Sequence, residues 1–263
     1  MPNHTIFNER PESQDRALKV IEKLGYTIVP RSEAEKKRGS RRAVLFTEEL
    51  QSFLSHQTYQ FGAEERYFSG GSIAKAMQTV DQFSAAGLYA ENKAIYELLC
   101  AGKSMEEDLP DGTRQSFDLS FIDFEHPENN TFQVTDEFEV ERPNGKFSRP
   151  DIVVLVNGIP LVVIECKKSS VDVMEGVNQN IRNWGEDYIP HLFRYTQLVL
   201  AMNPDKVLYG TCGTPAKYFV SWHEDDKEWL NDWCRKCSPD GQIKEQDRAL
   251  VSLLHPERLL DLI

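Results

Sequence analysis

Two apolar segments joined by a turn dipeptide constrain the fold more than any other part of this sequence. Residues 151–156 and 161–167 are rich in Val, Ile and Leu, and Asn157-Gly158 lies between them. An Asn-Gly pair between two such segments is a strong signal for a β-hairpin. We therefore expect two adjacent strands of a sheet at this point of the chain.

Hydrophobic periodicity places further elements on both sides of this hairpin. Helical spacing occurs over 18–24, much of 47–100 and 173–188, and strand patterns occur over 27–29, 115–121, 131–135, 197–202, 207–211 and 218–222. The order predicts a single α/β domain with a mixed central sheet flanked by helices. Within it, 1–100 is mainly helical, 115–222 forms the sheet with its helix, beginning as a meander, and 224–263 adds C-terminal helices.

Charged residues stand at the ends of the two hairpin strands. Glu165 and Lys167 follow the apolar run 161–164, and a period of two places them on one face of the strand. With Asp151 on the other strand, the carboxylates can hold a hard cation such as Mg²⁺. A lysine beside them can orient an attacking water and offset charge on a phosphate. The pattern predicts a phosphodiesterase site. The alternative is that Glu165 and Lys167 are surface residues at a strand end and that Asp151 caps a turn.

The register of the hairpin tests this site. A two-residue turn with regular pairing would place Asp151 opposite Ile164, on the face away from Glu165. A three-residue loop with Gly158 in the left-handed conformation would place Asp151 opposite Val163, on the face that Glu165 shares. The shared site therefore requires a three-residue loop or a bulge.

Composition excludes several classes of protein. No apolar run approaches the roughly 20 residues that a membrane helix needs, and residues 1–10 are polar, without the apolar core of a signal peptide. Five cysteines are an odd count, which argues against a secreted disulfide framework. We expect no membrane segment and a reducing, cytoplasmic location.

Charge is distributed unevenly along the chain. The net charge of −12 argues against a surface that attracts nucleic acid everywhere, and 91–141 holds fourteen acidic residues against three basic ones. The segment 31–42 is basic and is a candidate phosphate-contacting patch; its candidate DNA-binding residues are Lys36, Lys37, Arg38, Arg41 and Arg42. The alternative is an ordinary solvated surface segment.

The hairpin segment resembles a known nuclease motif. Pro150-Asp151 and Glu165-Cys166-Lys167 look like the PD-(D/E)xK motif, and the whole stretch RPDIVVLVNGIPLVVIECK resembles the N-terminal nuclease domain of the R subunit of type I restriction enzymes. The resemblance extends well over about 90–263, whereas before 90 it is limited to a helix that ends at Gly25-Tyr26. It implies a restriction-endonuclease-like fold.

The resemblance also implies roles for particular residues. Asp151 and Glu165 would be metal ligands, together with the backbone carbonyl of Cys166, and Lys167 would be the catalytic lysine. Many members of the superfamily have a Gln-x₃-Tyr pair on the next helix, and Gln179 would be its accessory glutamine. This sequence departs from the pattern, because Asn183 occupies the tyrosine position and Trp184 follows it. An acidic residue of the first helix, Glu12 or Asp15, is a further accessory candidate.

At the level of the whole protein, the resemblance implies an Mg²⁺-dependent endonuclease that cleaves double-stranded DNA. Its partners would be the methylation and specificity subunits of a type I restriction-modification complex. The sequence has no G-x₄-G-K-[ST] phosphate loop, so ATP would be used only by a motor region that follows residue 263. Two alternatives stay open: a stand-alone PD-(D/E)xK nuclease, and a non-catalytic docking module with the same fold.

Overall fold

A six-stranded mixed sheet forms the centre of the molecule. The computed structural model describes residues 12–82 and 86–263, so the polar segment 1–10 lies outside the described part. The sheet has the order β1-β6-β9-β10-β11-β12, formed by β1 (Thr27–Ile28), β6 (Phe132–Asp136), β9 (Ile152–Val156), β10 (Ile159–Cys166), β11 (Leu198–Asn203) and β12 (Lys206–Gly210). The β1–β6 and β10–β11 pairs are parallel, and the other neighbours are antiparallel. The predicted mixed α/β architecture is confirmed.

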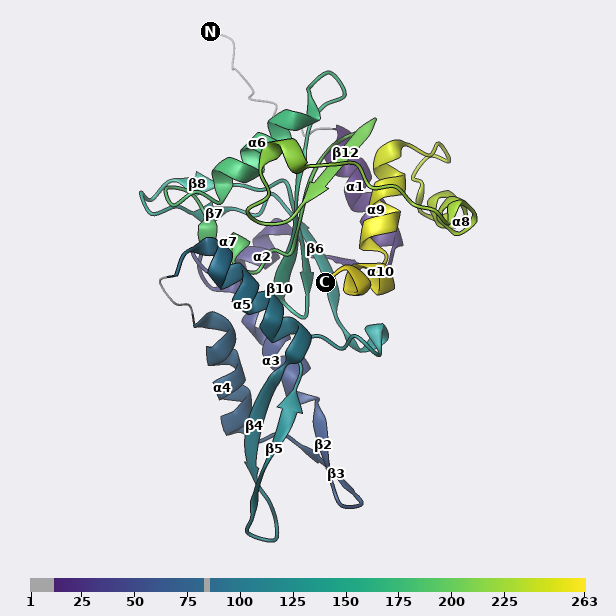
Figure 1. Cartoon of the computed structure of the whole chain (residues 1–263). Coiled ribbons are helices and arrows are strands. Elements are labelled where there is room, and N and C mark those ends of the chain that lie inside the picture. Colours follow the sequence, from purple (N-terminus) through teal and green to yellow (C-terminus); the bar gives the residue numbers. More distant parts are fainter. Residues whose placement is uncertain (1–11, 83–85) are drawn as a thin grey trace.

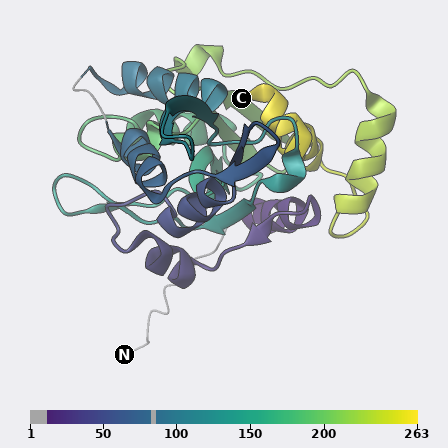
Figure 2. The same ribbon diagram turned by 90° about the horizontal axis from the view of Figure 1, so that it is seen from below.

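Helices cover both faces of this sheet (Figure 1). One face carries α1 (Glu12–Lys23) and α9 (Glu245–Leu254), and the other carries α6 (Val173–Asn183) and the short α7 (Pro190–Phe193). The C-terminal helices expected over 224–263 are α8 (Lys227–Cys237), α9 and α10 (Pro256–Leu262). Figure 2 shows that α8 stands at the periphery of the molecule. Because both faces are covered, every residue of β9 and β10 is buried.

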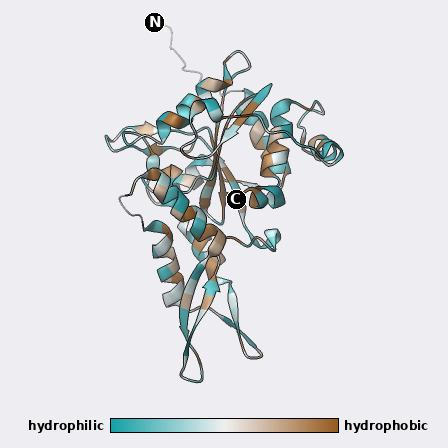
Figure 3. Cartoon of the chain, viewed as in Figure 1, coloured by the Kyte–Doolittle hydropathy of each residue, from teal (hydrophilic) through white to brown (hydrophobic). Residues whose placement is uncertain are grey.

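The part of the chain before the sheet is less helical than predicted. It contains α2 (Arg31–Arg38), α3 (Thr47–Ser55), α4 (Gly70–Asp81) and α5 (Leu88–Ala101), but also a hairpin of β2 (Thr58–Phe61) and β3 (Glu64–Tyr67) within the segment predicted to be helical. A second hairpin pairs β4 (Lys103–Asp108) with β5 (Arg114–Leu119). The two hairpins project from one end of the molecule (Figure 1), and their outer parts are largely hydrophilic (Figure 3).

Two strand assignments made from the sequence are wrong in part. The strand predicted over 115–121 is present as β5, but it pairs with β4 outside the central sheet and does not join a meander. The strand predicted over 218–222 is replaced by a 3₁₀ helix, η2 (Ala216–Tyr218), and a single bridge between Tyr209 and Val220. Alternation identifies a strand but not its partner, because the partner is set by contacts distant in sequence. The remaining short elements are η1 (Pro127–Asn129), β7 (Val140–Glu141) and β8 (Phe147–Ser148).

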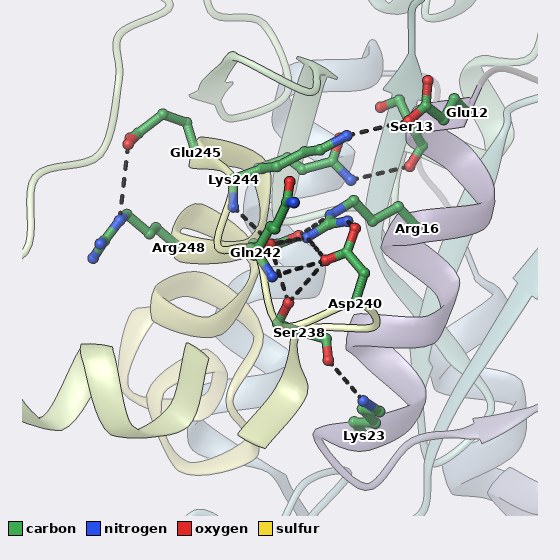
Figure 4. Close-up of polar contacts among 12 residues, drawn as sticks. Glu12, Ser13, Arg16, Lys23, Ser238, Asp240, Gln242, Lys244, Glu245 and Arg248 are labelled. Atoms are coloured by element: carbon green, nitrogen blue, oxygen red, sulfur yellow. Dashed lines mark hydrogen bonds and ion pairs between the residues drawn. The ribbon is translucent and has the colours of Figure 1, made fainter. Parts of the chain in front are cut away.

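A buried ionic cluster joins α1 to the C-terminal helices (Figure 4). The Arg16 guanidinium donates from Nε and Nη2 to the two carboxylate oxygens of Asp247, at 2.8 and 2.7 Å, and from Nη1 to Asp240 at 2.8 Å. Asp247 is fully buried and Arg16 nearly so. The Gln246 amide donates to the Ser13 carbonyl at 3.2 Å. This bidentate geometry fixes α1 against α9.

Candidate active site

The β9–β10 hairpin brings the predicted carboxylates together. Asn157 and Gly158 have positive φ of 49° and 80°, as a two-residue hairpin turn requires. The register then shifts between Pro160 and Val162, so that Ile164 pairs with Ile152 and the next residue, Glu165, comes level with Asp151. The predicted bulge is confirmed, and the three-residue loop is wrong.

Side-chain hydrogen bonds explain why the tight turn forms. Asn157 is buried; its amide nitrogen donates to the Phe121 carbonyl at 3.1 Å, and its amide oxygen accepts from the Thr131 backbone N–H at 2.8 Å. These contacts hold a non-glycine residue in the left-handed conformation, which Asn tolerates better than most residues. The bulge then corrects the face on which Asp151 lies.

Asp151 is held on both its side chain and its main chain. Its Oδ2 accepts from the Cys166 backbone N–H at 2.7 Å, and its carbonyl accepts from the Gln14 amide of α1 at 3.0 Å. Burial raises the pKa of this carboxyl, while the Cys166 N–H and the Lys167 charge act in the opposite direction. Asp151 is therefore oriented towards the end of β10.

Glu165 is a buried carboxylate without hydrogen-bond partners among the described residues. Its side chain is fully buried and neither carboxylate oxygen accepts a hydrogen bond from a described group. Its pKa is raised well above the usual range, first by burial and then by the negative charge of Asp151. Two unsatisfied oxygens at this depth are unfavourable unless a cation or a proton compensates them.

Lys167 projects beside Glu165 and contacts α6. Its Nζ donates to the Gln179 side-chain oxygen at 2.7 Å and lies 3.9 Å from Oε2 of Glu165. Gly176 on the same helix allows a close approach, because a Cβ there would lie 3.1 Å from the Ala201 Cβ and 3.5 Å from the Glu165 Cβ. The structure thus brings together Asp151, Glu165, Lys167 and Gln179.

An open pocket of about 710 Å³ reaches Asp151, Lys167 and Gln179, whereas Glu165 is buried behind its lining. The pocket is lined by Arg149, Asp151, Cys166, Lys167, Lys168, Val171, Glu175, Asn178, Gln179 and Arg182. No cluster of three or more His, Cys, Asp or Glu side chains suited to a metal occurs in 12–82 and 86–263. The orphaned oxygens of Glu165 beside Asp151 nevertheless fit a hard divalent cation, whose other ligands would be a backbone carbonyl and water.

Cys166 does not offer a reactive thiol. Its side chain is buried, and burial raises its pKa well above the usual range, so that the thiol stays protonated. Its backbone N–H is used by Asp151. The role predicted for its carbonyl as a metal ligand stays a prediction.

The first helix contributes a residue other than the acidic candidates. Glu12 is exposed and pairs with Lys244 at 3.2 Å, away from the pocket, and Asp15 is also exposed. Gln14, which lies between them, is buried and contacts Asp151. Helical geometry explains the difference, because neighbouring residues of a helix point in different directions. An amide in this position carries no charge signal in the sequence.

The predicted basic patch is largely engaged within the protein. Arg38 is buried, donates to the carbonyls of Ala43 and Glu139, and lies over the Phe138 ring. Lys37 pairs with Glu49, and Arg41 pairs with Glu139 at 2.7 Å. Arg38 is therefore committed to contacts inside the protein, and Lys37 and Arg41 each have a carboxylate partner, although Arg41 is exposed. Lys36 and Arg42 are exposed, and their DNA-binding role stays a prediction.

In the described part of the chain, no aromatic ring takes the place of the tyrosine of the Gln-x₃-Tyr pattern, since Asn183 occupies that position and the Trp184 ring packs elsewhere. Asn183, one helical turn after Gln179, is buried and accepts from the Ser148 hydroxyl at 3.3 Å. Trp184 packs edge-on against Phe193, with ring centroids 5.8 Å apart. The nearby ring is that of Tyr188, which is half-buried and lies under the Arg182 guanidinium of the pocket.

The mixed sheet and its paired carboxylates define a nuclease-like α/β domain. A sequence model of the family described as type I restriction enzyme R protein N terminus matches residues 6–218. The chain belongs to this family. The resemblance inferred from the hairpin motif is thus confirmed, and it also covers most of the first 90 residues.

Known relatives are endonuclease subunits of type I restriction enzymes. The chain is 27% identical over 266 residues to the HindI endonuclease subunit of Haemophilus influenzae, covering 98% of this chain and 24% of that protein. It is 40% identical over 85 residues to the SsaAORF53P endonuclease subunit of Staphylococcus saprophyticus, covering 32% of this chain and 9% of that protein. The chain thus spans about a quarter or less of these relatives. Among the described residues, no helix combines the length and the apolar character that crossing a membrane requires.

Proposed function

We propose that this chain is the DNA-cleaving domain of a type I restriction enzyme R subunit and hydrolyses phosphodiester bonds with Mg²⁺. The observation that carries the proposal is the buried, unsatisfied Glu165 carboxylate level with Asp151 and next to Lys167. Such a grouping is unfavourable for stability alone. It is what a hydrolytic metal site requires.

The side chains divide the work between holding and positioning. Asp151, Glu165 and the Cys166 carbonyl would hold the cation, which when bound supplies a polarised phosphoryl oxygen and a more acidic water. The Cys166 N–H and the Gln14 amide keep Asp151 in place. The Lys167 ammonium would offset negative charge on the phosphate and orient the attacking water.

Gln179 would act as a positioning residue for Lys167. Its amide oxygen holds the ammonium at 2.7 Å and at the mouth of the pocket. This contact leaves two ammonium hydrogens available for substrate or water. The lysine is therefore ordered before substrate binds, which reduces the entropy lost on reaching the transition state.

The partners and the energy source lie outside this chain. Double-stranded DNA would be the substrate, and methylation and specificity subunits would supply recognition of the site. ATP would be hydrolysed by motor regions that this sequence does not contain. The experiment below therefore uses the assembled enzyme.

Substitution of Lys167 or Asp151 tests the proposal. In the assembled restriction enzyme with Mg²⁺ and ATP, we expect Lys167→Ala or Asp151→Ala to reduce cleavage of unmodified plasmid by a factor of at least about 100. Lys167→Ala removes the ammonium that offsets charge in the transition state, and Asp151→Ala removes a ligand of the cation. Chelation of Mg²⁺ should have the same effect. Cleavage is followed by gel electrophoresis.

The control is Lys206→Ala, which removes an exposed lysine at the start of β12. It should cleave like the wild type, and circular dichroism should show that all variants are folded. Normal cleavage by a folded Lys167→Ala enzyme would reject the proposal and would favour a non-catalytic docking module.

A further inference from the structure

Two arginines from different elements share one aromatic ring beside the pocket. The guanidinium of Arg142 lies 4.5 Å from the centroid of the Tyr188 ring, and that of Arg182 lies 5.6 Å from it. Arg142 follows β7 and Arg182 lies near the end of α6. The β7–β8 hairpin and α6 are neighbours in Figure 1. The ring therefore gathers two cations from segments distant in sequence.

Arg142 is fixed in this position by several contacts. Its Nε donates to the Ser148 hydroxyl at 2.8 Å, and that hydroxyl donates in turn to Asn183 of α6. Its backbone N–H donates to the Lys146 carbonyl at 2.7 Å, which closes the hairpin. Ser148 and Asn183 are both buried. An arginine held in this way loses little further entropy when it binds an anion.

These two guanidinium groups are not neutralised by the protein. In the described residues, neither Arg142 nor Arg182 has a carboxylate within ion-pair distance, whereas Arg31, Lys37 and Arg41 all do. Stacking occupies the flat face of a guanidinium and leaves its N–H edge available. In a chain with a net charge of −12, unpaired cations fixed at one place indicate a site for an anion.

The location of the pair selects the kind of anion. Arg182 lines the pocket that contains Asp151 and Lys167. Arg142 extends the positive charge from this pocket towards the exposed loop 142–146. An arginine edge binds phosphate through two parallel hydrogen bonds. A polymer with regularly spaced phosphates can therefore contact both arginines while one of its phosphates lies at the carboxylates.

We propose that Arg142 and Arg182, held on Tyr188, form a clamp for the phosphate backbone of duplex DNA at the mouth of the active-site pocket. This inference rests on the proposed nuclease function and adds the surface that holds the strand being cut. Asn183 has a positioning role in the clamp, because it connects α6 to the hairpin through Ser148.

Binding of a labelled duplex tests the clamp. The 263-residue chain carrying Lys167→Ala, so that DNA is not cut, is titrated against a fluorescein-labelled duplex of about 30 base pairs at several salt concentrations. We expect Arg142→Gln and Arg182→Gln each to weaken binding by a factor of about 3 to 10 and to reduce the salt dependence by about one counterion. Tyr188→Leu should weaken binding with the salt dependence unchanged, since both charges remain.

The matched control is Arg235→Gln, which removes an exposed arginine on the distant helix α8. It should bind like the parent chain. Equal affinity and equal salt dependence for the Arg142→Gln and Arg182→Gln chains would overturn the clamp, as would failure of the parent chain to bind duplex DNA. Plasmid cleavage by the assembled enzyme would still decide the nuclease function separately.

Discussion

The burial of the Glu165 carboxylate is unfavourable for the stability of the fold. Its two carboxylate oxygens are buried and accept no hydrogen bond from the described residues, and Asp151 adds a second negative charge. In an apolar sheet, such a pair of carboxylates opposes folding, because the Lys167 ammonium 3.9 Å from Glu165 does not outweigh burial and the charge of Asp151. The arrangement is understandable if a cation compensates both carboxylates.

Glu165→Gln should therefore separate stability from metal binding. Without metal, we expect the variant to be about 1 to 3 kcal/mol more stable than the wild type, because a neutral amide is less unfavourable in this position. Millimolar Mg²⁺ should raise the melting temperature of the wild type and leave that of the variant unchanged. Both are measured by thermal and urea unfolding.

Glu175→Gln is the matched control, because Glu175 lines the same pocket but is exposed. It should retain the response to Mg²⁺. If Mg²⁺ stabilised the Glu165→Gln variant as strongly as the wild type, the assignment of Glu165 as a ligand would be wrong.

The site residues differ in how far the sequence could reveal them. Asp151, Glu165 and Lys167 carry charge at the ends of apolar strands, so local pattern was enough to select them. Gln14 could not be found in this way, because its contact with Asp151 spans 137 positions and an amide leaves no mark in a charge pattern. The same limitation hid Arg142, whose partners Ser148, Asn183 and Tyr188 meet only in the folded chain.

At the scale of elements, the tight turn between β9 and β10 depends on a glycine for two reasons. Gly158 has a positive φ of 80°, and a Cβ at this position would lie 2.3 Å from the Phe46 carbonyl oxygen. The Phe46 backbone N–H also donates to the Gly158 carbonyl at 2.9 Å. The turn is thus packed directly against the start of α3.

Gly158→Ala should destabilise the fold more than the same change at Gly112. Gly112 has the same φ of 80° but no atom within 4 Å of the Cβ position, so its substitution should lower the free energy of unfolding by about 1 kcal/mol through backbone strain alone. The clash with Phe46 should add about 1 to 3 kcal/mol. Equal urea midpoints for the two variants would contradict this account.

The ion pair between Arg16 of α1 and Asp247 of α9 should contribute to the stability of the fold. Arg16→Met leaves Asp247 buried without its bidentate partner, and we expect a loss of about 3 to 5 kcal/mol of unfolding free energy. Arg235→Met on α8 removes an exposed pair with Asp232 and should change stability by less than about 1 kcal/mol. Urea unfolding followed by circular dichroism measures both variants. If Arg16→Met lowered the free energy of unfolding as little as Arg235→Met does, the Arg16 cluster would contribute little to stability.

Elements were predictable where local pattern and environment agree. The hairpin of β9 and β10 follows from an Asn-Gly turn between apolar runs, and both strands are buried as such runs require. The β2–β3 hairpin was missed, because its residues 64–67 are polar and mostly exposed and show no strand alternation. It is supported instead by tertiary contact, since Tyr59 stacks on Phe117 of β5 with ring centroids 4.1 Å apart.

For the whole molecule, the folded arrangement of charge differs from its order in the sequence. The basic segment 31–42 folds against acidic residues from 49 and 137–139, so Arg31, Lys37 and Arg41 are neutralised within the protein. The sequence shows these charges but not all of their pairings, because Glu137 and Glu139 are about 100 positions away from the arginines that they contact. Beside the carboxylates, positive charge comes from the pocket residues Arg149, Lys167, Lys168 and Arg182. Arg142 lies next to this pocket through the Tyr188 ring that it shares with Arg182, and no local basic run marks either arginine.

The pH dependence of folding should include a contribution from His191. Burial lowers its pKa to about 4, and the charges of Arg194 and Arg42 act in the same direction; Asp81 lines the same cavity. Because the unfolded state then binds more protons between pH 6.5 and 4, stability is complete above pH 6.5 and falls as the pH decreases.

His191→Gln should remove this contribution. Between about pH 7.5 and 5.5, we expect the wild type to lose about 1 kcal/mol more unfolding free energy than the variant. Urea unfolding at the two pH values measures the difference, and this range lies above the titration of ordinary carboxylates. If the free energy of unfolding changed with pH by the same amount in both proteins, His191 would make no contribution to the pH dependence of stability.

Helix α1 contacts both the C-terminal helices and the candidate site. On one side of α1, the Gln246 amide donates to the Ser13 carbonyl and the Arg16 guanidinium donates to Asp247. On the other side, the Gln14 amide donates to the Asp151 carbonyl. The helix therefore connects the C-terminal helices to Asp151 through hydrogen bonds of polar groups near its start. The packing of α9 and the placement of Asp151 therefore depend on the same turns of one helix.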